Sequence, residues 1–390
     1  MVKKMVPEVR FEGFEDEWKT SKIKDLASIS TGKSNTEDNV SYGQYPFYVR
    51  SETIERSNQY LFDEEAVLTV GDGVGTGKVF HYVNGKYDLH QRVYRIFNFN
   101  KNISAKCFYF YFSEYFYQRV MGLTAKTSVD SVRYEMISEM DVKLPSQDEQ
   151  EYINNFFTKI EEKILHSEQE LQKLKNFKQA MLQKMFPKEG ETVPEVRFEG
   201  FSDEWELNKL KEISNIISGG TPDTTIPEYW DGDINWYSPT EIGKSAYTKA
   251  STRKITQLGL EKSSANLLPK DRTVLFTSRA GIGDMAILKN SGATNQGFQS
   301  LVLKDDIDAY FIYSIGFQIK KYANKNASGS TFMEISGKRL GEMELRIPSK
   351  DEQLIIGSFF KSLDNKIELE DKKLQKLKQF KKAMLQKMFV

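Results

Sequence analysis

Apolar residues recur at steps of three and four along two long stretches of the chain. They are Phe157, Ile160, Ile164, Leu171 and Leu174 in the first stretch, and Phe360, Leu363, Ile367, Leu374 and Leu377 in the second. This spacing indicates the apolar seam of a coiled coil, and we favour helix pairing within the protein over a ligand role for it. The stretches follow Pro145 and Pro348, and each predicted helix has about 38 residues and a length of roughly 57 Å.

The regions that precede the two predicted helices have the patterns of mixed, strand-rich domains. In the first region we expect strands at 66–70, 78–83 and 93–97, a hairpin turn at Asn84 and Gly85, and a helix near 108–121. In the second region we expect strands at 273–277, 284–288 and 300–303, and a helix near 309–323. The shared order of elements predicts that the two domains are distant copies of each other.

Two nearly identical pairs of segments confirm an internal repeat. Residues 7–18 read PEVRFEGFEDEW and residues 194–205 read PEVRFEGFSDEW, while LQKLKNFKQAMLQKMF at 171–186 recurs as LQKLKQFKKAMLQKMF at 374–389. If the helices pair antiparallel, the end of the second meets residues 7–18 as the end of the first meets residues 194–205. The sequence therefore predicts an α+β fold with two strand-rich domains, two long antiparallel coiled-coil helices and a pseudo-twofold repeat.

Composition narrows the classes of function. Basic and acidic residues balance at 55 each, so only local clusters could bind nucleic acid. The single cysteine, Cys107, excludes a disulfide framework, and three histidines, His81, His90 and His166, leave little for metal chemistry. The chain has no apolar run near the ~20 residues that cross a bilayer and no signal peptide at its start, so we expect a cytoplasmic protein without membrane association.

Known catalytic motifs are missing. GDGVGTGK at 71–78 resembles a phosphate loop, but Asp72 and Val79 stand where that motif needs Gly and Ser or Thr. The chain contains no Gly-x-Ser-x-Gly elbow and no His-Glu-x-x-His. The glycine loops themselves are open to two interpretations, as hairpin turns or as loops shaped for close approach to a phosphate backbone. We predict a protein that is not an enzyme.

Several motifs, taken together, resemble the specificity (S) subunit of Type I restriction-modification systems. They are SGGTP at 218–222, EYWDGDINW at 228–236, LFTSRAGIGDMAIL at 275–288, ATNQGFQSL at 293–301, and the helix entries LPSQDEQ at 144–150 and IPSKDEQ at 347–353. The resemblance covers essentially the whole chain. The first domain departs from the pattern, with a shorter entry around residues 30–33 and 45–48.

The resemblance implies four parts: an N-terminal target-recognition domain at 1–143, a central spacer helix at 144–193, a C-terminal target-recognition domain at 194–346 and a distal spacer helix at 347–390. Each domain would read one half of a bipartite site in double-stranded DNA, and the helices would set the gap. The family's partners are two methyltransferase subunits and, in restriction, motor-nuclease subunits. No cofactor is expected on this chain, because S-adenosylmethionine, ATP and Mg²⁺ belong to those other subunits.

Reading DNA requires hydrogen-bonding side chains in a groove and cations near phosphates. The candidates are basic and polar residues predicted to lie in loops at matching places of the two domains. In the first domain they are Lys33, Arg50, Lys78, His90, Gln91, Arg92, Lys126, Thr127, Ser128 and Arg133. In the second domain they are Thr221, Tyr237, Ser238, Lys244, Arg279, Asn295, Gln296, Gln299, Ser330, Thr331 and Lys338.

Two other classes of function stay open at this point. A coiled-coil scaffold with two protein-binding domains would show the same repeat, and sequence-specific DNA binding by the purified complex separates it from a specificity subunit. A self-contained DNA-modifying enzyme would need a methyltransferase domain, for which no segment remains. Methyl transfer by the chain alone tests that second class.

Overall fold

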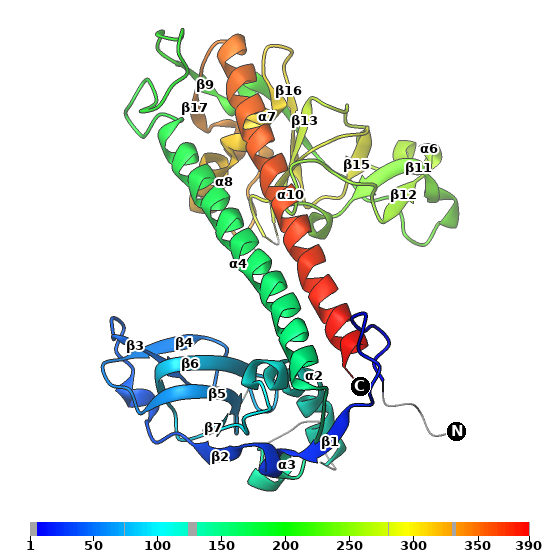
Figure 1. Ribbon diagram of the computed structural model, residues 1–390. Helices are drawn as coiled ribbons and strands as arrows, with labels where there is room; N and C mark the ends of the chain where they lie inside the picture. The colour runs from blue at the N-terminus through cyan, green and yellow to red at the C-terminus, as the bar shows by residue number, and fades with distance from the viewer. Residues whose placement is uncertain (1–5, 74, 124–130, 280, 330–332, 390) are drawn as a thin grey trace. The chain divides into compact units, whose positions relative to one another are not determined.

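The computed structural model describes residues 6–389, except residues 74, 124–130, 280 and 330–332. The chain divides into two compact units, Met1–Glu168 with Lys373–Val390, and Gln169–Lys372. Two long helices, α4 (Gln147–Lys184) and α10 (Lys350–Met388), each contribute one part to each unit (Figure 1). Their lengths of 38 and 39 residues agree with the predicted helices.

A six-stranded sheet with the order β2-β7-β5-β6-β3-β4 forms the centre of the first unit (Figure 1). Its strands are β2 (Ser28–Thr31), β3 (Tyr45–Tyr48), β4 (Ile54–Ser57), β5 (Phe62–Val70), β6 (Phe80–Leu89) and β7 (Val93–Phe97). Neighbours are antiparallel except for β3 and β6, which pair in parallel. Helix α2 (Ala105–Gly122) packs on this sheet, with the Phe80 and Phe112 rings 5.5 Å apart, so its aromatic residues close the core.

The second unit repeats this plan with two smaller sheets, of orders β10-β16-β13-β14 and β12-β11-β15. The strands are β10 (Ser214–Ser218), β11 (Trp230–Tyr237), β12 (Arg253–Ile255), β13 (Thr273–Phe276), β14 (Met285–Ile287), β15 (Gly292–Thr294) and β16 (Gln299–Leu303). Here β11 and β15 pair in parallel, as β3 and β6 do. Helices α7 (Ala309–Ser314) and α8 (Gly316–Asn326) follow, and Phe311 joins the buried core.

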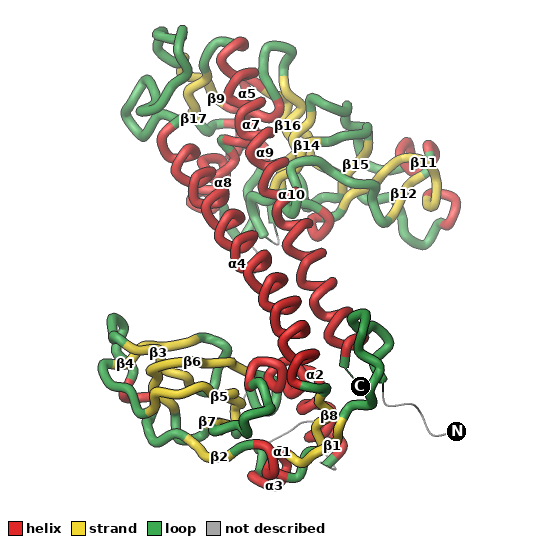
Figure 2. Tube along the Cα trace, viewed as in Figure 1, coloured by secondary structure: helices red, strands yellow, loops and turns green. Residues whose placement is uncertain are grey.

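Short elements complete both units. In the first they are β1 (Lys19–Lys22), α1 (Ile23–Leu26), the 3₁₀ turn η1 (Thr36–Asp38), α3 (Tyr134–Ser138) and β8 (Asp141–Leu144). In the second they are β9 (Glu206–Lys209), α5 (Leu210–Ile213), η2 (Pro227–Tyr229), η3 (Pro239–Glu241), α6 (Gln257–Glu261), α9 (Gly337–Gly341) and β17 (Glu344–Ile347). Strand β1 pairs with β8, and β9 pairs with β17, at matching places before each long helix. Both units begin with a strand, a short helix and a strand, and both end with a short helix and a strand before the long helix (Figure 2). The second unit adds η3 and α6 between these ends.

The structure corrects two local predictions. Asn84 and Gly85 do not form a hairpin turn, because they lie inside β6 and pair with Glu65 and Glu64 of β5. Gly85 adopts a φ of 119° within the strand, and the turn between β5 and β6 is the glycine loop that starts at residue 71. The predicted helix at 309–323 is two helices, broken at Ile315, where a Cβ on Gly316 would lie 2.6 Å from the sulfur of Met285.

Contacts within each unit confirm that the long helices are antiparallel. In the first unit, Glu161 and Glu168 of α4 pair with Lys381 and Lys378 of α10 at 2.7 and 2.6 Å. Residues later in α4 therefore pair with residues earlier in α10. In the second unit, Lys178 pairs with Asp364 and the Phe186 ring stacks on Phe360, with centroids 5.8 Å apart, which is again antiparallel. The seam residues Phe157 and Phe360 are fully buried, so burial of apolar surface stabilises both helix pairs.

The duplicated segments occupy equivalent places, as the repeat predicts. In the first unit, the Val9 amide donates to the carbonyl of Lys387 at 3.0 Å, and the Trp18 ring meets Phe389 with centroids 5.8 Å apart. In the second, the Val196 amide donates to the carbonyl of Lys184 at 2.9 Å, and Trp205 meets Phe186 at 6.1 Å. Residues 7–18 and 194–205 are therefore the joints at the ends of the helices.

A buried ion pair fastens each joint to the start of a long helix. Arg10 donates two hydrogen bonds of 2.8 Å to the carboxylate of Glu149, and Arg197 donates two of 2.8 Å to Glu352. The glutamate side chains are 1% exposed and the arginines 13% and 15%. Hydrogen bonding to these carboxylates raises the pKa of Arg10 and of Arg197. Two parallel bonds fix geometry as well as charge, so each joint is held in one orientation.

Membrane insertion through a helix finds no support in the described part of the chain. None of its helices combines the length and the apolar character that a bilayer span requires.

Candidate nucleic-acid interface

The polar loops of each unit lie on a backbone framework that the two units share. Four backbone hydrogen bonds of the first unit have counterparts in the second. In the first unit they join His90 N to Tyr48 O, Gly71 N to Arg92 O, Val132 N to Gly71 O and Gly77 N to Val70 O. Their counterparts, in the same order, join Asn295 N to Tyr237 O, Ser278 N to Gly297 O, Ile335 N to Ser278 O and Gly283 N to Thr277 O. The parallel strand pairs keep the same register, with Tyr48 opposite Leu89 and Tyr237 opposite Thr294. The framework therefore defines which positions correspond between the units.

Two loop clusters arise from this framework. The first loop cluster comprises residues 32–34, 48–50, 71–73, 75–79, 89–92 and 131–133, and the second comprises residues 219–221, 237–239, 277–279, 281–284, 294–297 and 334–338. Glycines allow neighbouring loops of each cluster to pack backbone against backbone. A Cβ on Gly32 would lie 2.0 Å from the carbonyl oxygen of Leu89, and one on Gly219 would lie 2.0 Å from that of Asn295.

Opposite charges meet in the first loop cluster. Asp72 lies 3.6 Å from Arg50 and 3.6 Å from Arg92, measured between carboxylate oxygens and guanidinium nitrogens. The two arginine side chains are 49% and 63% exposed and the aspartate 31%. Lys78 adds a further cation, with its ammonium group 4.8 Å from the centre of the Tyr117 ring. The cluster therefore presents solvated cations around one partly covered carboxylate.

His90 lies beneath these charges and is 4% exposed. Its Nδ1 accepts a hydrogen bond from the backbone amide of Arg92 at 3.0 Å, and its Nε2 lies 3.5 Å from the hydroxyl of Thr36. Burial lowers the pKa of His90, and the positive charge of Arg50 lowers it further. An accepting Nδ1 requires the neutral ring with its single proton on Nε2, so the lowered pKa and the hydrogen bond favour the same state.

Neutral hydrogen-bonding groups dominate the second loop cluster. Thr221 donates to the side-chain oxygen of Gln296 at 2.6 Å, and the Asn295 side chain accepts from the Gly297 amide at 2.8 Å. Ser238 donates to Glu241 at 2.8 Å. Arg279 lies at the start of the glycine loop, where its backbone bridges to that of Glu334. Within the described residues, no hydrogen bond or ion pair holds its guanidinium group.

Most of the predicted contact residues that the structure describes lie at the surface. The exposed residues are Lys33, Arg50, Lys78, Gln91, Arg92, Arg133, Lys244, Gln296 and Lys338, and Thr221, Ser238, Arg279 and Asn295 are partly exposed. Three are buried: His90, Tyr237 and Gln299. Tyr237 donates its hydroxyl to the carbonyl of Lys249 at 2.8 Å. Burial favours a supporting role for these three, and the predicted residues Lys126, Thr127, Ser128, Ser330 and Thr331 lie outside the described residues.

Sequence reasoning missed Asp72 as a member of the site. Its ion pairs join residues 22 and 20 positions away in the chain, to Arg50 and Arg92, and no local pattern reports such pairs. The available signal was an acidic residue between two glycines, in a loop flanked by predicted contact arginines. The pairs at Arg10 and Arg197 were missed for the same reason, since Glu149 lies far from Arg10 in sequence.

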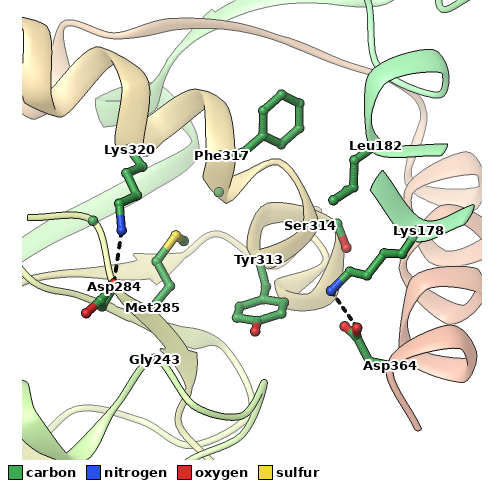
Figure 3. Close-up of a pocket in the computed structure, with 12 residues that line it drawn as sticks. Lys178, Leu182, Gly243, Asp284, Met285, Tyr313, Ser314, Phe317, Lys320 and Asp364 are labelled. Atoms are coloured by element: carbon green, nitrogen blue, oxygen red, sulfur yellow. Dashed lines mark hydrogen bonds and ion pairs between the residues drawn. The ribbon is translucent and has the colours of Figure 1, made fainter. Parts of the chain in front are cut away.

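A cavity of about 220 Å³ in the second unit borders the second loop cluster, with which it shares Gly283 and Asp284. Figure 3 shows its lining, with Tyr313 and Phe317 between an ion pair of Lys178 with Asp364 and one of Lys320 with Asp284. Binding pockets for small molecules commonly have roughly 300–1,000 Å³. The cavity is small and its charges are paired, so it does not define a ligand site. No group of three potential metal ligands occurs among the described residues either.

Two units with one backbone framework and unlike polar loop clusters define a duplicated recognition protein. The sequence profile of the family described as "Type I restriction modification DNA specificity domain" matches residues 15–176 and again residues 202–379. The chain belongs to this family.

Individual relatives carry the same description. The chain is 35% identical over 192 residues to the Type I restriction enzyme MjaIX specificity subunit of Methanocaldococcus jannaschii, which is 48% of this chain and 44% of that protein. It is 31% identical over 215 residues to the EcoDI specificity subunit of Escherichia coli, of which it spans 45%. The chain thus spans less than half the length of these two relatives. The MjaVIII specificity subunit of M. jannaschii is 22% identical, with 95% of this chain and 91% of that protein aligned.

Solved structures share the fold over the full chain. The S subunit of a Type-I restriction-modification system from M. genitalium has a TM-score of 0.69 and 16% identity, with 99% of each chain covered. A chain from a structure concerned with complex assembly and conformational transition of the type I R-M system has a TM-score of 0.57 and 14% identity, with 97% of this chain and 99% of that chain covered. At these identities the likeness is one of fold.

Proposed function

We propose that the chain is the DNA sequence-recognition subunit of a Type I restriction-modification complex and that it is not itself the catalyst. Each unit carries one target-recognition domain, residues 1–143 and 194–346, which reads one half of a bipartite site in double-stranded DNA. The helical segments 144–193 and 347–390 set the gap between the half-sites. The methyl donor and the nucleotide chemistry belong to the other subunits, and the complex acts in the cytoplasm.

One observation carries this proposal: a shared set of backbone hydrogen bonds presents different side chains in the two loop clusters. Base edges in the major groove are distinguished by patterns of donors and acceptors, so two half-sites require two different sets of side chains on a comparable scaffold. A pair of protein-binding domains would bury apolar anchors at its contact surfaces. The exposed side chains of both clusters are instead basic, amide or hydroxyl groups, which supports DNA as the ligand.

Balanced charge limits how tightly the chain alone holds DNA. Non-specific affinity comes mainly from cations that neutralise phosphates, and this chain has equal numbers of basic and acidic residues. We therefore expect affinity for DNA to rise sharply when the methyltransferase subunits join the complex. Equal affinity of the isolated chain and of the complex at physiological salt would contradict the proposal.

A duplicated aromatic surface supports the docking of two copies of one methyltransferase partner. The rings of Phe11, Phe156 and Phe380 follow each other in the first unit, with centroid distances of 5.9 and 6.3 Å. The corresponding rings of Phe198, Phe359 and Phe177 follow each other at 5.8 and 6.3 Å in the second. Equivalent patches on a repeated framework offer the same partner two equivalent places.

Exposure at the ends of these two surfaces makes the docking testable. Phe380 is 47% exposed and Phe177 is 48% exposed, so both present apolar area to a partner. We expect Phe380→Asp and Phe177→Asp each to remove one of the two methyltransferase subunits, and the double variant to remove both. Native mass spectrometry of the co-purified complex counts the copies. Retention of both copies by the double variant would place the docking surface elsewhere, with Tyr42→Asp, at a side chain 97% exposed, as the control.

The recognition itself is tested in cells that express this chain with its methyltransferase subunit. Single-molecule sequencing should show a bipartite methylated motif that disappears when the chain is omitted. Methyl transfer by the chain alone, or methylation without a bipartite motif, would contradict the proposed role. A motor-nuclease subunit would add ATP-dependent cleavage of unmethylated DNA to the same specificity.

A further inference from the structure

Three neighbouring positions differ in chemistry between the loop clusters although their backbones correspond. Tyr48 and Tyr237 are equivalent, so Arg50, two residues after the first, is the counterpart of Pro239 in the second unit. Arg92 and Gly297 accept equivalent backbone hydrogen bonds and are therefore counterparts. Asp72 bridges to Ser131 as Arg279 bridges to Glu334, so Asp72 is the counterpart of Arg279.

In the first unit these positions form one charged group. Asp72 lies 3.6 Å from both arginines, and its Oδ1 is enclosed by protein without a hydrogen bond from any described residue. The carboxylate therefore draws the two guanidinium groups of Arg50 and Arg92 toward one place in the cluster. Both side chains stay about half exposed or more, at 49% and 63%, so they retain free N–H donors that face solvent.

In the second unit the same positions carry a single cation. Gly297 is confined by Pro239, because a Cβ built on Gly297 would lie 2.7 Å from the proline Cγ. No side chain can therefore extend from this position without moving Pro239, and Arg279 stands where Asp72 stands in the first unit. Arg279 has no carboxylate partner among the described residues, so its donors are not committed within the protein.

We propose that this three-position group determines which bases the two units read, which rests on the DNA-recognition function proposed above. Arg279 in the second unit, and Arg50 and Arg92 in the first, donate to O6 and N7 of guanine in the major groove. Asp72 is a positioning residue that holds Arg50 and Arg92. Gln91 and Gln296 correspond and are the same residue type, so this pair cannot make the half-sites differ.

Guanine is the expected base because a planar guanidinium matches its two acceptors with two parallel N–H bonds. A lysine keeps the positive charge but lacks this paired geometry, so Arg279→Lys separates base reading from phosphate contact. A phosphate contact would survive the change to lysine nearly intact. A guanine contact would lose roughly 5- to 150-fold in discrimination at one base pair.

The test uses the full complex with its methyltransferase subunits and reads the methylated motif of each variant by single-molecule sequencing. We expect Arg279→Lys and Arg279→Ala to relax one guanine position of one half-site and to leave the other half-site unchanged. Arg272→Lys is the matched control, because this arginine precedes β13, pairs with Asp305 at 2.9 Å and lies outside the loop cluster. An unchanged motif in the Arg279 variants would overturn the inference.

Salt dependence provides a second readout on the same variants. If Arg279→Ala weakens binding equally on all DNA sequences and reduces the slope of log K against log salt by about 0.9, the residue contacts a phosphate and the inference is wrong. For the positioning residue, Asp72→Asn should relax the half-site of the first unit without lowering the thermal midpoint, and Asp72→Glu should restore part of the discrimination. An unaltered motif in Asp72→Asn would exclude the positioning role.

Different results would contradict the proposed function and the assignment of the reading residues. Absence of any bipartite motif with the wild-type complex would contradict the proposed function itself. A bipartite motif that persists unchanged in the variants at positions 72 and 279 would contradict only this assignment of the reading residues.

Discussion

The buried pair of Arg10 and Glu149 offers a sharp test of how the joints are held. Replacing Arg10 with methionine keeps an unbranched apolar stem but removes both 2.8 Å hydrogen bonds to a carboxylate that is 1% exposed. Glu149 would then carry an uncompensated charge inside the protein. Loss of one partner of such a pair costs about 3–5 kcal/mol, which for a unit of this size lowers Tm by roughly 6–20 °C.

The repeat supplies a matched comparison. Arg197 binds Glu352 with the same two distances of 2.8 Å and similar burial, so Arg197→Met should cost as much but in the second unit. The double variant Arg10→Met/Glu149→Leu should regain most of the loss, because apolar residues of similar volume replace a buried ion pair at little cost.

Amide hydrogen exchange followed by mass spectrometry assigns the effect to a unit. We expect faster exchange in β5 and β7 for Arg10→Met, and in β13 and β16 for Arg197→Met. If either single variant lowers the free energy of unfolding by less than about 1 kcal/mol, the pair behaves as a solvated surface ion pair. That result would refute the reasoning from burial.

Three further predictions address the helices, the histidines and the glycines. Inserting four residues after Lys173 adds roughly 6 Å of helix, so methylation mapping should show a DNA gap about two base pairs longer with both half-sites unchanged. Altered bases in either half-site would contradict the proposal that the helices set the gap. Burial lowers the pKa of His81 and of His90. The unfolded chain therefore binds more protons than the folded chain below about pH 6.5, and stability falls as the pH drops through this range. Thermal melts from pH 7.5 to 5.5 should show a smaller fall in Tm for His90→Asn than for the wild type. Gly219→Ala should disrupt the second loop cluster and lower Tm, because its Cβ would lie 2.0 Å from the Asn295 carbonyl oxygen. Gly122→Ala, whose Cβ would have no described residue within 4 Å, should leave Tm unchanged or raised.

Much of the architecture was predictable because the apolar periodicity and the joint segments each occur twice in the chain. The seam of Phe157 and Ile160 predicted a long helix, and the second copy of the joint segment predicted antiparallel pairing before any contact was known. The contact of Val9 with Lys387, matched by that of Val196 with Lys184, confirms this geometry. Sequence identity between two distant segments requires equivalent surroundings for both, and only one helix orientation provides them.

Local turn signals were less reliable. Asn84 and Gly85 have the composition of a hairpin turn, yet strand pairing with β5 continues across them because eight ladder partners outweigh one local preference. The helix after β16 breaks at Ile315, where Gly316 packs against Met285 of a neighbouring strand. Both outcomes depend on residues distant in the sequence, so a window of neighbours could not reveal them.

The amino-acid sequence alone determined the duplicated plan, the two long helices and the family, since periodicity and repeated motifs are properties of neighbouring residues and of comparison between segments. Only the tertiary structure decided which polar side chains stand together. It placed Asp72 between Arg50 and Arg92, buried Tyr237 and Gln299, and left the guanidinium of Arg279 without a carboxylate partner among the described residues. The physical reason is that an ion pair and a burial depend on distances in space, which strand register and loop closure set between residues far apart in the chain.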